Sequence, residues 1–418
     1  MAVADLRQDA EQADLGRDVA IVGTISAAHF CSHFYQFTIP LLFPRIQAEY
    51  GVGFTELGLI VTVFYASSGF AQTAAGFLVD HVGPSRVLTA GLGLLAASMA
   101  LVALVPSFWL IYPAAALAGL GNSVFHPADY SILTGGVRKD WLARAYGVHQ
   151  LGGNLGWAVA PAAVLTLSHF FGWRMALVVL GLFGYLLLAV VWWQGRTLAV
   201  GDAKAARSRV AAGPRTAPLQ MLMAPAILLC FAYFAMLAMA LTGFQSFLPA
   251  ALHTAHGTPL GAAGSALTGY LLGGVAGILF GGWLADHSRR HERILALGLL
   301  IAAVLVMIVG LVDLGIGALV VMISAAGFCS GMTAPSRDMM VRGATPPGST
   351  GKVFGFVYSG LDLGSAFVPP VLGLFLDHGI PIGVFALTAV ALAVCIAIAY
   401  ALQRAGTAAG ALVARPAE

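Results

Sequence analysis

Charged residues are scarce in this chain. Asp, Glu, Lys and Arg make up 9% of its 418 residues, whereas an average soluble domain carries roughly 25%. Hydrophobic residues make up 59%. So few charges cannot cover the water-facing surface of a protein of this length. The composition therefore excludes an ordinary soluble protein and indicates an integral membrane protein.

Cysteines and catalytic motifs are equally sparse. The four cysteines stand singly in apolar stretches, without the paired spacing of a disulfide framework or a zinc site. The sequence has no nucleophile elbow and no phosphate-binding loop in a supporting context. Its histidines are scattered over several stretches and lack paired acidic or thiol ligands. We therefore expect no enzymatic activity, no cofactor and no bound metal.

Long apolar runs are what the chain has in abundance. A helix needs roughly 20 apolar residues to cross a membrane core about 30 Å thick. We predict an all-α integral membrane protein with twelve transmembrane helices, approximately over residues 19–43, 55–79, 85–105, 109–133, 143–168, 174–194, 220–250, 260–285, 293–312, 316–341, 352–376 and 381–403.

Lys and Arg are distributed unevenly between the two sides that these helices define. With the N-terminus inside, the inner segments hold nearly all the basic residues, and the outer side holds only Arg45 and Arg174. Positively charged short loops stay in the cytoplasm. We expect a multi-pass protein of a bacterial inner membrane with both termini cytoplasmic. The pI near 8.7 follows from this topology, so it indicates no nucleic-acid partner.

The chain repeats itself at a distance of about 208 residues. Gly147, Gly156 and Pro161 return as Gly355, Gly364 and Pro369, each 208 positions later. A repeat of this length within apolar segments is typical of transporters built from two equivalent bundles. We predict a cytoplasmic tail over 1–18, two pseudo-symmetric six-helix bundles over 19–194 and 219–403, a cytoplasmic linker over 195–218 and a cytoplasmic tail over 404–418.

Two short motifs carry a family resemblance. Gly76-Phe-Leu-Val-Asp80-His-Val-Gly83-Pro-Ser-Arg86 follows the second predicted helix, and Gly282-Trp-Leu-Ala-Asp286-His-Ser-Arg-Arg290 follows the eighth. Both resemble the cytoplasmic signature of the major facilitator superfamily. The resemblance implies the major facilitator fold, with the first, fourth, seventh and tenth helices lining a central cavity.

These motifs also predict a conformational latch. A glycine lets two helices approach closely, and a carboxylate near a helix end can bond to a neighbouring helix N-terminus or to an arginine. Such a contact would hold one conformation and break in the other. The predicted latch consists of Gly76, Asp80, Arg86, Gly282, Asp286 and Arg290.

A second resemblance points to one branch of that superfamily. Gly119-Leu-Gly-Asn-Ser-Val-Phe-His126-Pro127, together with Gln150-Leu-Gly152-Gly153-Asn154-Leu-Gly156, is similar to the fosmidomycin-resistance-type transporters. This resemblance implies a proton-driven exporter of small toxic compounds.

Polar side chains inside the predicted helices mark candidate binding residues, because a polar group in hydrocarbon usually faces a bundle interior or a cavity. His29, His33 and Gln36 share one helical face. Gln36 is related by the repeat to Gln245, so we expect the two glutamines to face each other across the central path. The predicted substrate-binding residues are His29, His33, Gln36, His126, Tyr130, Gln150, Asn154, Gln245, Arg337, Tyr358 and Asp362.

The fourth and tenth helices hold charges of opposite sign at repeat-related positions. Asp129 corresponds to Arg337, 208 positions later. One hypothesis is that Asp129 and Arg337 approach each other as a gate pair. The alternative is that each side chain pairs locally. Arg337 also favours an anionic or zwitterionic substrate.

A carboxyl group inside the eleventh helix is the leading candidate for proton coupling. Asp362 stands where the first repeat has the neutral Asn154. Removal from water disfavours a charged carboxylate, which could allow Asp362 to load and release a proton. Asp129, His33 and His126 are the other candidates, since histidine can also titrate near neutral pH.

The favoured function is proton-coupled export of a small anionic or amphiphilic compound, such as a drug or toxic metabolite, by alternating access. The partners we expect are this substrate, protons and the lipid bilayer, with the chain acting as a monomer. One alternative is an uptake symporter for an organic acid or related metabolite, since sequence does not fix the sign of coupling. A non-transporting membrane sensor is the second alternative.

Overall fold

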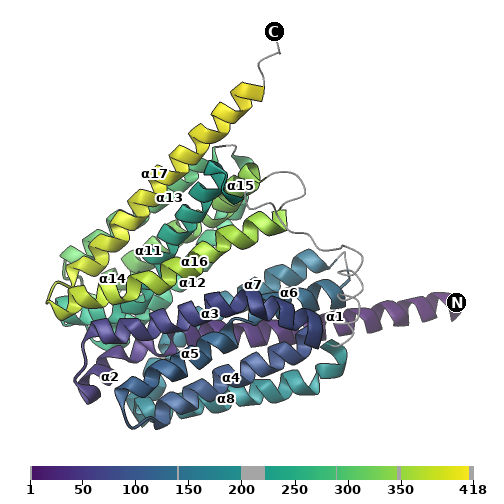
Figure 1. Cartoon of the computed structure of the whole chain (residues 1–418), viewed down its shortest axis with the longest axis horizontal. Coiled ribbons are helices and arrows are strands. Elements are labelled where there is room, and N and C mark those ends of the chain that lie inside the picture. The colour runs from purple at the N-terminus through teal and green to yellow at the C-terminus, as the bar shows by residue number, and fades with distance from the viewer. Residues whose placement is uncertain (1, 139–140, 199–221, 289, 346–349, 414–418) are drawn as a thin grey trace. The chain divides into compact units, whose positions relative to one another are not determined.

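The computed structural model describes residues 2–138, 141–198, 222–288, 290–345 and 350–413 (Figure 1). Within these ranges, the side chains are described except at residues 2–14, 73, 80, 143, 286, 350–352, 354–355 and 405–413. Most of the predicted linker over 195–218 therefore lies outside the described part of the chain, whereas the backbone of most of the two predicted tails, over 2–18 and 404–413, is described and helical. These assignments stay predictions.

Helices account for the secondary structure of the described residues. In chain order they are α1 (Ala2–Thr38), η1 (Pro40–Leu42), α2 (Phe43–Tyr50), α3 (Phe54–Val82), α4 (Pro84–Leu104), η2 (Phe108–Leu110), α5 (Ile111–Asn122), α6 (Phe125–Gly136), α7 (Leu142–Phe171), α8 (Trp173–Trp193), α11 (Pro225–His256), α12 (Leu260–His287), α13 (His291–Leu311), α14 (Ile316–Gly331), α15 (Ala334–Ala344), α16 (Thr350–Asp377) and α17 (Ile382–Val413).

Eleven of the described helical segments are long and apolar enough to cross a membrane. The first predicted span, in α1, is not among them, because His29, His33 and Gln36 dilute its apolar character. The polar side chains that are candidate binding residues in α1 are thus the ones that lower its mean hydropathy. The predicted all-α membrane fold is confirmed.

Two of the predicted spans are broken. The fourth is built from α5 and α6, and the tenth from α14 and α15. Pro127 lies in the first turn of α6, and Pro335 in the first turn of α15. Proline has no backbone N–H to donate to the preceding turn. The interruption beside Pro127 therefore recurs at the repeat-related Pro335.

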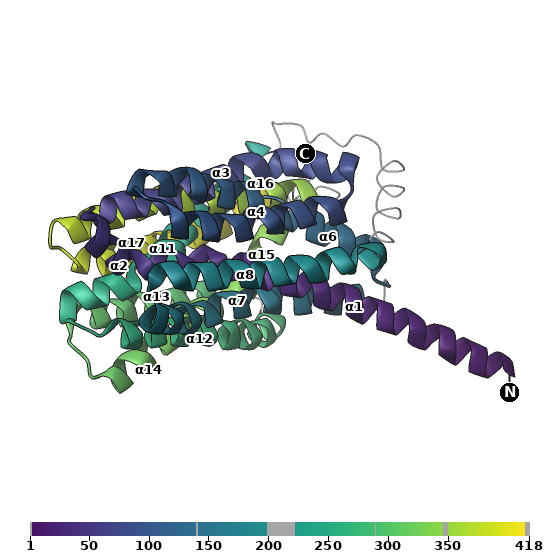
Figure 2. The same cartoon turned by 90° about the horizontal axis from the view of Figure 1, so that it is seen from below.

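The chain divides into two compact units. The first contains Met1–Thr38, Ser67–Ala160 and Leu167–Arg215, and the second contains Ile39–Ala66, Pro161–Thr166 and Thr216–Glu418. In the first unit, α4 packs against α5 and α8, while α1 contacts α6 and α8. Figures 1 and 2 both show α4 and α8 running side by side.

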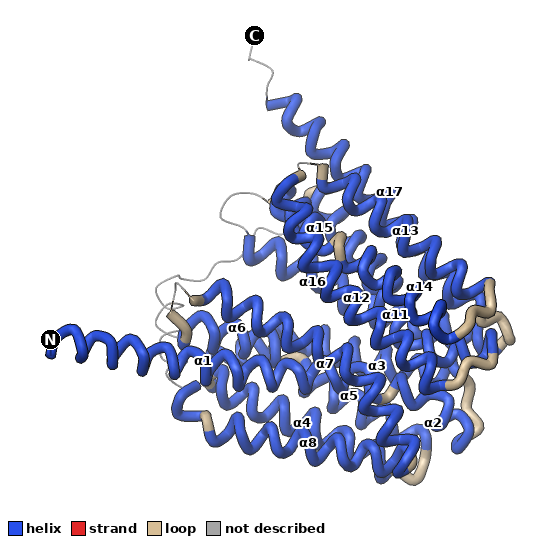
Figure 3. Tube along the Cα trace, turned by 180° about the vertical axis from the view of Figure 1, so that it is seen from behind, coloured by secondary structure: helices blue, strands red, loops and turns tan. Residues whose placement is uncertain are grey.

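In the second unit, α11 packs against α12, α16 and α17, and α12 packs against α14. α13 lies alongside α17, as Figure 3 also shows. Phe234, Leu299, Val357 and Cys395 belong to the buried core of this unit. The core is apolar, as the composition requires.

Glycines allow the closest helix contacts, and they do so at repeat-related positions. A Cβ on Gly152 would lie 2.8 Å from the carbonyl oxygen of Ser26 in α1, and one on Gly156 would collide with the Phe30 carbonyl. In the second unit, a Cβ on Gly360 would lie 2.7 Å from the carbonyl oxygen of Phe231 in α11. The same device therefore packs α7 on α1 and α16 on α11.

The predicted latch glycines behave differently. A Cβ on Gly76 or Gly282 would meet no described atom within 4 Å. Among the described residues no neighbouring helix approaches these two glycines, and the close approach expected there stays a prediction. The Asp80 and Asp286 side chains lie outside the described residues. Arg86 and Arg290 are exposed, and a latch formed in another state stays a prediction.

One carboxylate connects two helices of the second unit that are distant in sequence. Asp377, the last residue of α16, accepts hydrogen bonds from the backbone N–H groups of Phe54 and Thr55 and from the Thr55 hydroxyl, the latter at 2.6 Å. Free N–H groups at a helix start need such an acceptor. Asp377 therefore caps the N-terminus of α3.

A buried cluster of histidines and an aspartate as the candidate functional site

Four imidazole rings gather inside the first unit. His29 and His33 come from α1, His126 from α6 and His149 from α7. The centre of the His29 ring lies 4.0 Å from that of His149, 4.2 Å from that of His33 and 5.6 Å from that of His126. The structure thus brings together three predicted site residues, and adds His149, which was not among the predicted site residues.

Asp129 lies against this group of rings. Its Oδ2 atom is 3.4 Å from His29 Nδ1 and 3.8 Å from His149 Nε2. The Asp129 side chain is 0% exposed, and those of His29 and His149 are each 1% exposed. We call these three residues, together with His33 and His126, the histidine cluster. It places five ionisable side chains inside one helical unit.

The polar atoms at the centre of the cluster are not hydrogen-bonded within the described part of the chain. Both Asp129 carboxylate oxygens, both His149 nitrogens and His29 Nδ1 lack a hydrogen-bond partner there. Leaving a buried polar group unsatisfied costs about 1–3 kcal/mol. Such exceptions in a folded protein call for an explanation, and a bound proton, ion or substrate is one.

Glycine residues make room for these rings. A Cβ on Gly153 would lie 2.7 Å from ring atoms of both His29 and His33. The neighbouring Gly152 and Gly156 bring the backbone of α7 close to α1. The glycine-rich sequence of α7 therefore positions the histidines by letting two helices pack closely around them.

The cluster has an exposed edge. His126 and Tyr130, both on α6, are exposed. The Tyr130 ring centre lies 6.2 Å from that of His126 and 5.6 Å from that of His149. The buried centre of the cluster is thus one ring away from exposed side chains.

A second polar network adjoins the cluster along α1. Asn122, at the end of α5, accepts hydrogen bonds from the Ser32 hydroxyl at 2.7 Å and from the Gln36 amide at 3.3 Å. Its own amide donates to the Ser68 hydroxyl at 2.9 Å. Trp157 donates its ring N–H to Gln36 at 3.0 Å and stacks on His33 at 4.1 Å. Gln36 is therefore held in place by α5 and α7.

Sequence reasoning did not select Asn122, Ser68 or Trp157. Asn122 was visible within the motif that starts at Gly119, and an amide inside an apolar stretch is the signal that could have found it. Ser68 and Trp157 carry no comparable signal, because serine and tryptophan are ordinary residues of membrane helices.

The remaining predicted residues of α7 lie outside the cluster. Gln150 is exposed and Asn154 is half-buried. His149, one position before Gln150, is the residue that faces the cluster. Their assignment as substrate-binding residues stays a prediction.

A partly buried ion pair connects α1 to the end of α6. Arg138, just after α6, donates to Asp18 with 2.7 Å between Nε and Oδ2. Asp18 is 0% exposed. Sequence reasoning placed both residues on the cytoplasmic side but did not pair them.

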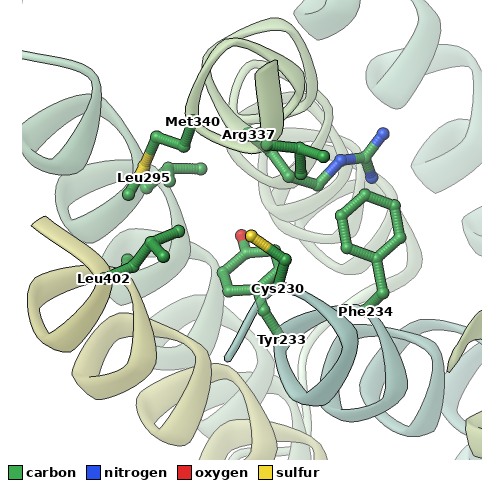
Figure 4. A pocket seen from close by; sticks show the side chains of 9 residues that line it. Cys230, Tyr233, Phe234, Leu295, Arg337, Met340 and Leu402 are labelled. Carbon is green, nitrogen blue, oxygen red and sulfur yellow. The ribbon is translucent and has the colours of Figure 1, made fainter. Parts of the chain in front are cut away.

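The second unit holds Arg337 beside a small apolar pocket (Figure 4). Arg337 Nε lies 2.9 Å from Asp338 Oδ1, and its guanidinium group stacks over the Phe234 ring at 4.6 Å. The Tyr358 hydroxyl donates to the same Asp338 oxygen at 3.3 Å. The pocket is lined by Cys230, Tyr233, Phe234, Leu295, Arg337, Met340, Val341, Ala399 and Leu402.

Arg337 and Asp129 each have a neighbour of their own unit. Asp338 is the partner of Arg337, and His29 and His149 are the neighbours of Asp129. This arrangement corresponds to the local pairing that the sequence left open. A direct approach of Asp129 and Arg337 stays a prediction.

Asp362 is half-buried in α16. Within the described residues it has neither a hydrogen bond nor an ion pair, although Tyr65 is close enough to interact with it electrostatically. Gln245 is half-buried in α11, where it interacts with the Tyr270 hydroxyl. That Gln245 and Gln36 face each other stays a prediction.

Comparison with known proteins identifies the family. The model of the Major Facilitator Superfamily matches residues 25–263 and 229–413. The chain belongs to the Major Facilitator Superfamily. As a superfamily member it is a multi-pass membrane transporter, and it is not an enzyme.

The relatives of this transporter include a drug-resistance protein. It is 26% identical to the Fosmidomycin resistance protein of Escherichia coli (strain K12) over 369 residues, which cover 86% of each chain. It is 26% identical over 153 residues to the Probable L-galactonate transporter of the same organism, covering 35% of this chain and 32% of that one.

Solved structures confirm the fold of this superfamily member. A bacterial homolog of the human lysosomal transporter Spinster, in an inward-facing and occupied conformation, superposes with a TM-score of 0.75. The match covers 92% of this chain and 96% of that one at 15% sequence identity. At that identity the likeness concerns the fold alone.

Proposed function

We propose that this transporter exports a small anionic or amphiphilic compound, such as a drug or toxic metabolite, in exchange for protons. The observation that carries the proposal is the histidine cluster, in which four ionisable side chains lie buried in a largely apolar helical unit, those of His29, His33, Asp129 and His149. Ionisable groups inside membrane proteins are costly and typically mark substrate or ion pathways. Similarity to the Fosmidomycin resistance protein supports export.

The proposed substrate site combines charged side chains with neutral side chains that form hydrogen bonds. Arg337 would attract an anionic group, and the amides of Gln36 and Gln245 would orient it. The remaining proposed contacts are His29, His33, His126, Tyr130, Gln150, Asn154, Tyr358 and Asp362. Substrate would shift the transporter between states by binding those states unequally.

We assign the coupling proton to Asp362. Its carboxyl group lies on a membrane-crossing helix and has no ion-pair partner among the described residues. A carboxylate in such surroundings is stabilised by taking up a proton. Protonation and release at Asp362 would therefore give the two states different stabilities, which is what coupling requires.

The experiment is transport by purified protein in oriented vesicles, with a pH gradient imposed in each direction. Antiport predicts that substrate moves against the direction of proton flow. Asp362→Asn is expected to abolish accumulation against a gradient while leaving downhill exchange, because the neutral amide can no longer release a proton. Asp313→Asn, which changes an exposed carboxylate between α13 and α14, is the matched control.

Two results would refute parts of this proposal. Gradient-driven pumping by Asp362→Asn would remove Asp362 as the proton carrier. Movement of substrate in the same direction as protons would replace export by the alternative, an uptake symporter for an organic acid. The partial similarity to the Probable L-galactonate transporter supports an organic acid as the substrate of that alternative.

Topology and assembly complete the proposal. We place both termini in the cytoplasm of a bacterial cell, because the basic residues gather on that side. The chain is proposed to act as a monomer. Protease accessibility of the two termini in sealed vesicles of known orientation tests the first point.

A further inference from the structure

The centre of the histidine cluster has the geometry of a cation site. We infer that His29, Asp129 and His149 together bind a divalent transition-metal ion of the Zn²⁺ type. The three side chains come from three helices, all are buried, and each offers one donor atom within 4.8 Å of the other two. This inference goes beyond the proposed export function and does not depend on it.

The distances fit a tetrahedral ion. Nitrogen and oxygen ligands lie about 2.0–2.2 Å from Zn²⁺, which places two ligand atoms of one tetrahedron roughly 3.4 Å apart. His29 Nδ1 and Asp129 Oδ2 are separated by 3.4 Å, and His149 Nε2 and Asp129 Oδ2 by 3.8 Å. The third pair of ligand atoms, on His29 and His149, lies within 4.8 Å, so the Asp129 oxygen is placed for an ion while the two rings must turn to bind it.

The donor set selects the class of ion. Two imidazoles and one carboxylate suit zinc and its neighbours, whereas Mg²⁺ and Ca²⁺ prefer oxygen ligands alone. The same atoms, His29 Nδ1, His149 Nε2 and both Asp129 oxygens, have no hydrogen-bond partner within the described part of the chain. A metal ion would satisfy these buried atoms.

Three protein ligands leave a fourth position open. His126 and Tyr130 form the exposed edge beside the site, so a water molecule or a small ligand could enter from there. The His29 and His149 rings are stacked, with 29° between their planes. Each nitrogen lone pair must point at the ion, so metal binding would splay the two rings apart.

The test is metal binding by the purified full-length protein in detergent, without a gradient or substrate. Calorimetric titration with Zn²⁺ is expected to show one tight binding site per chain. Co²⁺ is the second probe, because a tetrahedral Co²⁺ ion with nitrogen ligands absorbs visible light more strongly than hydrated Co²⁺. Since no transport is measured, the result is independent of the export proposal.

Variants locate the ion. His149→Gln and Asp129→Asn should each weaken Zn²⁺ binding more than about tenfold, while His149→Cys should retain it, because a thiolate is also a zinc ligand. His169→Gln is the matched control: His169 lies on the same helix as His149 and is exposed. Thermal unfolding in the absence of metal identifies any variant that fails to fold.

Three outcomes would overturn the inference. One is the absence of a Zn²⁺ site in the wild-type protein at micromolar metal. Another is binding that survives both His149→Gln and Asp129→Asn in folded protein. The third is a Co²⁺ complex with the weak spectrum of an octahedral ion.

Discussion

Individual polar residues fix the interior of the first unit. Asn122 accepts two hydrogen bonds from α1 and donates one to Ser68 on α3. One side chain therefore connects three helices beside the histidine cluster. The Gln36 side chain is held on both sides, because its amide N–H donates to Asn122 and its oxygen accepts a hydrogen bond from Trp157.

Replacing Asn122 is expected to weaken the protein. Asn122→Ala leaves several buried polar groups without their partner, and this should lower the free energy of unfolding by about 1–3 kcal/mol. Thermal unfolding of the detergent-solubilised protein measures the effect. Ser265→Ala is the control, because Ser265 is exposed and bonds only within its own helix. Equal stability of the two variants would contradict this role of Asn122.

Residue spacing predicted part of the cluster correctly. His29 and His33 lie one helical turn apart, and Asp129 follows His126 by one turn, so each pair shares a face. Spacing along a helix reveals which side chains share a face, but it does not reveal which helix packs against that face. For that reason Asn122, Ser68 and Trp157 were missed, and the local partner of Arg337 was only one of two alternatives.

Helices pack most closely where glycines face a neighbouring backbone. A side chain on Gly156 would collide with the Phe30 carbonyl, whereas a Cβ on Gly147 in the same helix would meet no atom of the described residues within 4 Å. The two glycines therefore differ in role although both lie in α7. One is required for packing, and the other is not.

The two glycines predict opposite effects. Gly156→Ala should destabilise the protein by about 1–3 kcal/mol, because the new methyl group forces α1 and α7 apart. Gly147→Ala is the matched control and should be neutral or stabilising by up to about 1 kcal/mol, since alanine favours helix. Apparent melting temperatures in detergent measure both. Similar destabilisation by the two substitutions would contradict the packing argument.

The cap on α3 gives a second prediction for the elements. Asp377→Ala removes the acceptor for the first N–H groups of α3 and should cost about 0.5–2 kcal/mol of stability. Asp313→Ala changes an exposed carboxylate and serves as control. If Asp377→Asn retained the full stability of the wild type, the amide oxygen would be sufficient as the acceptor. Wild-type stability of Asp377→Ala would refute the role of Asp377 as a cap.

Hydropathy predicted the positions of the membrane-crossing helices well, and the two interrupted helices each contain a proline beside the break. The breaks beside Pro127 and Pro335 reflect a missing backbone donor, which is a local property. The close approach expected at Gly76 and Gly282 stays a prediction, because glycine permits a close contact without requiring one. Contacts between distant segments, such as Asp377 with α3, leave no local signal in the sequence.

At the scale of the whole molecule, the two copies of the repeat share their helix packing but not their polar residues. Glycines at repeat-related positions pack α7 on α1 and α16 on α11, yet the polar content of the two copies differs. The first copy carries the histidine cluster, and the second carries Arg337 and Asp362. Sequence alone predicted the superfamily fold from this repeat and its motifs, while substrate and direction depend on side chains that the repeat does not share.

The central claim is proton-coupled export by alternating access, and cysteine labelling beside the histidine cluster tests it most directly. His126→Cys, in a variant without the four native cysteines, is exposed to a membrane-impermeant maleimide in vesicles of both orientations. We predict modification from either side, at rates that shift in opposite directions when the pH gradient is reversed. Modification from one side alone under every gradient, or from neither side, would contradict the account.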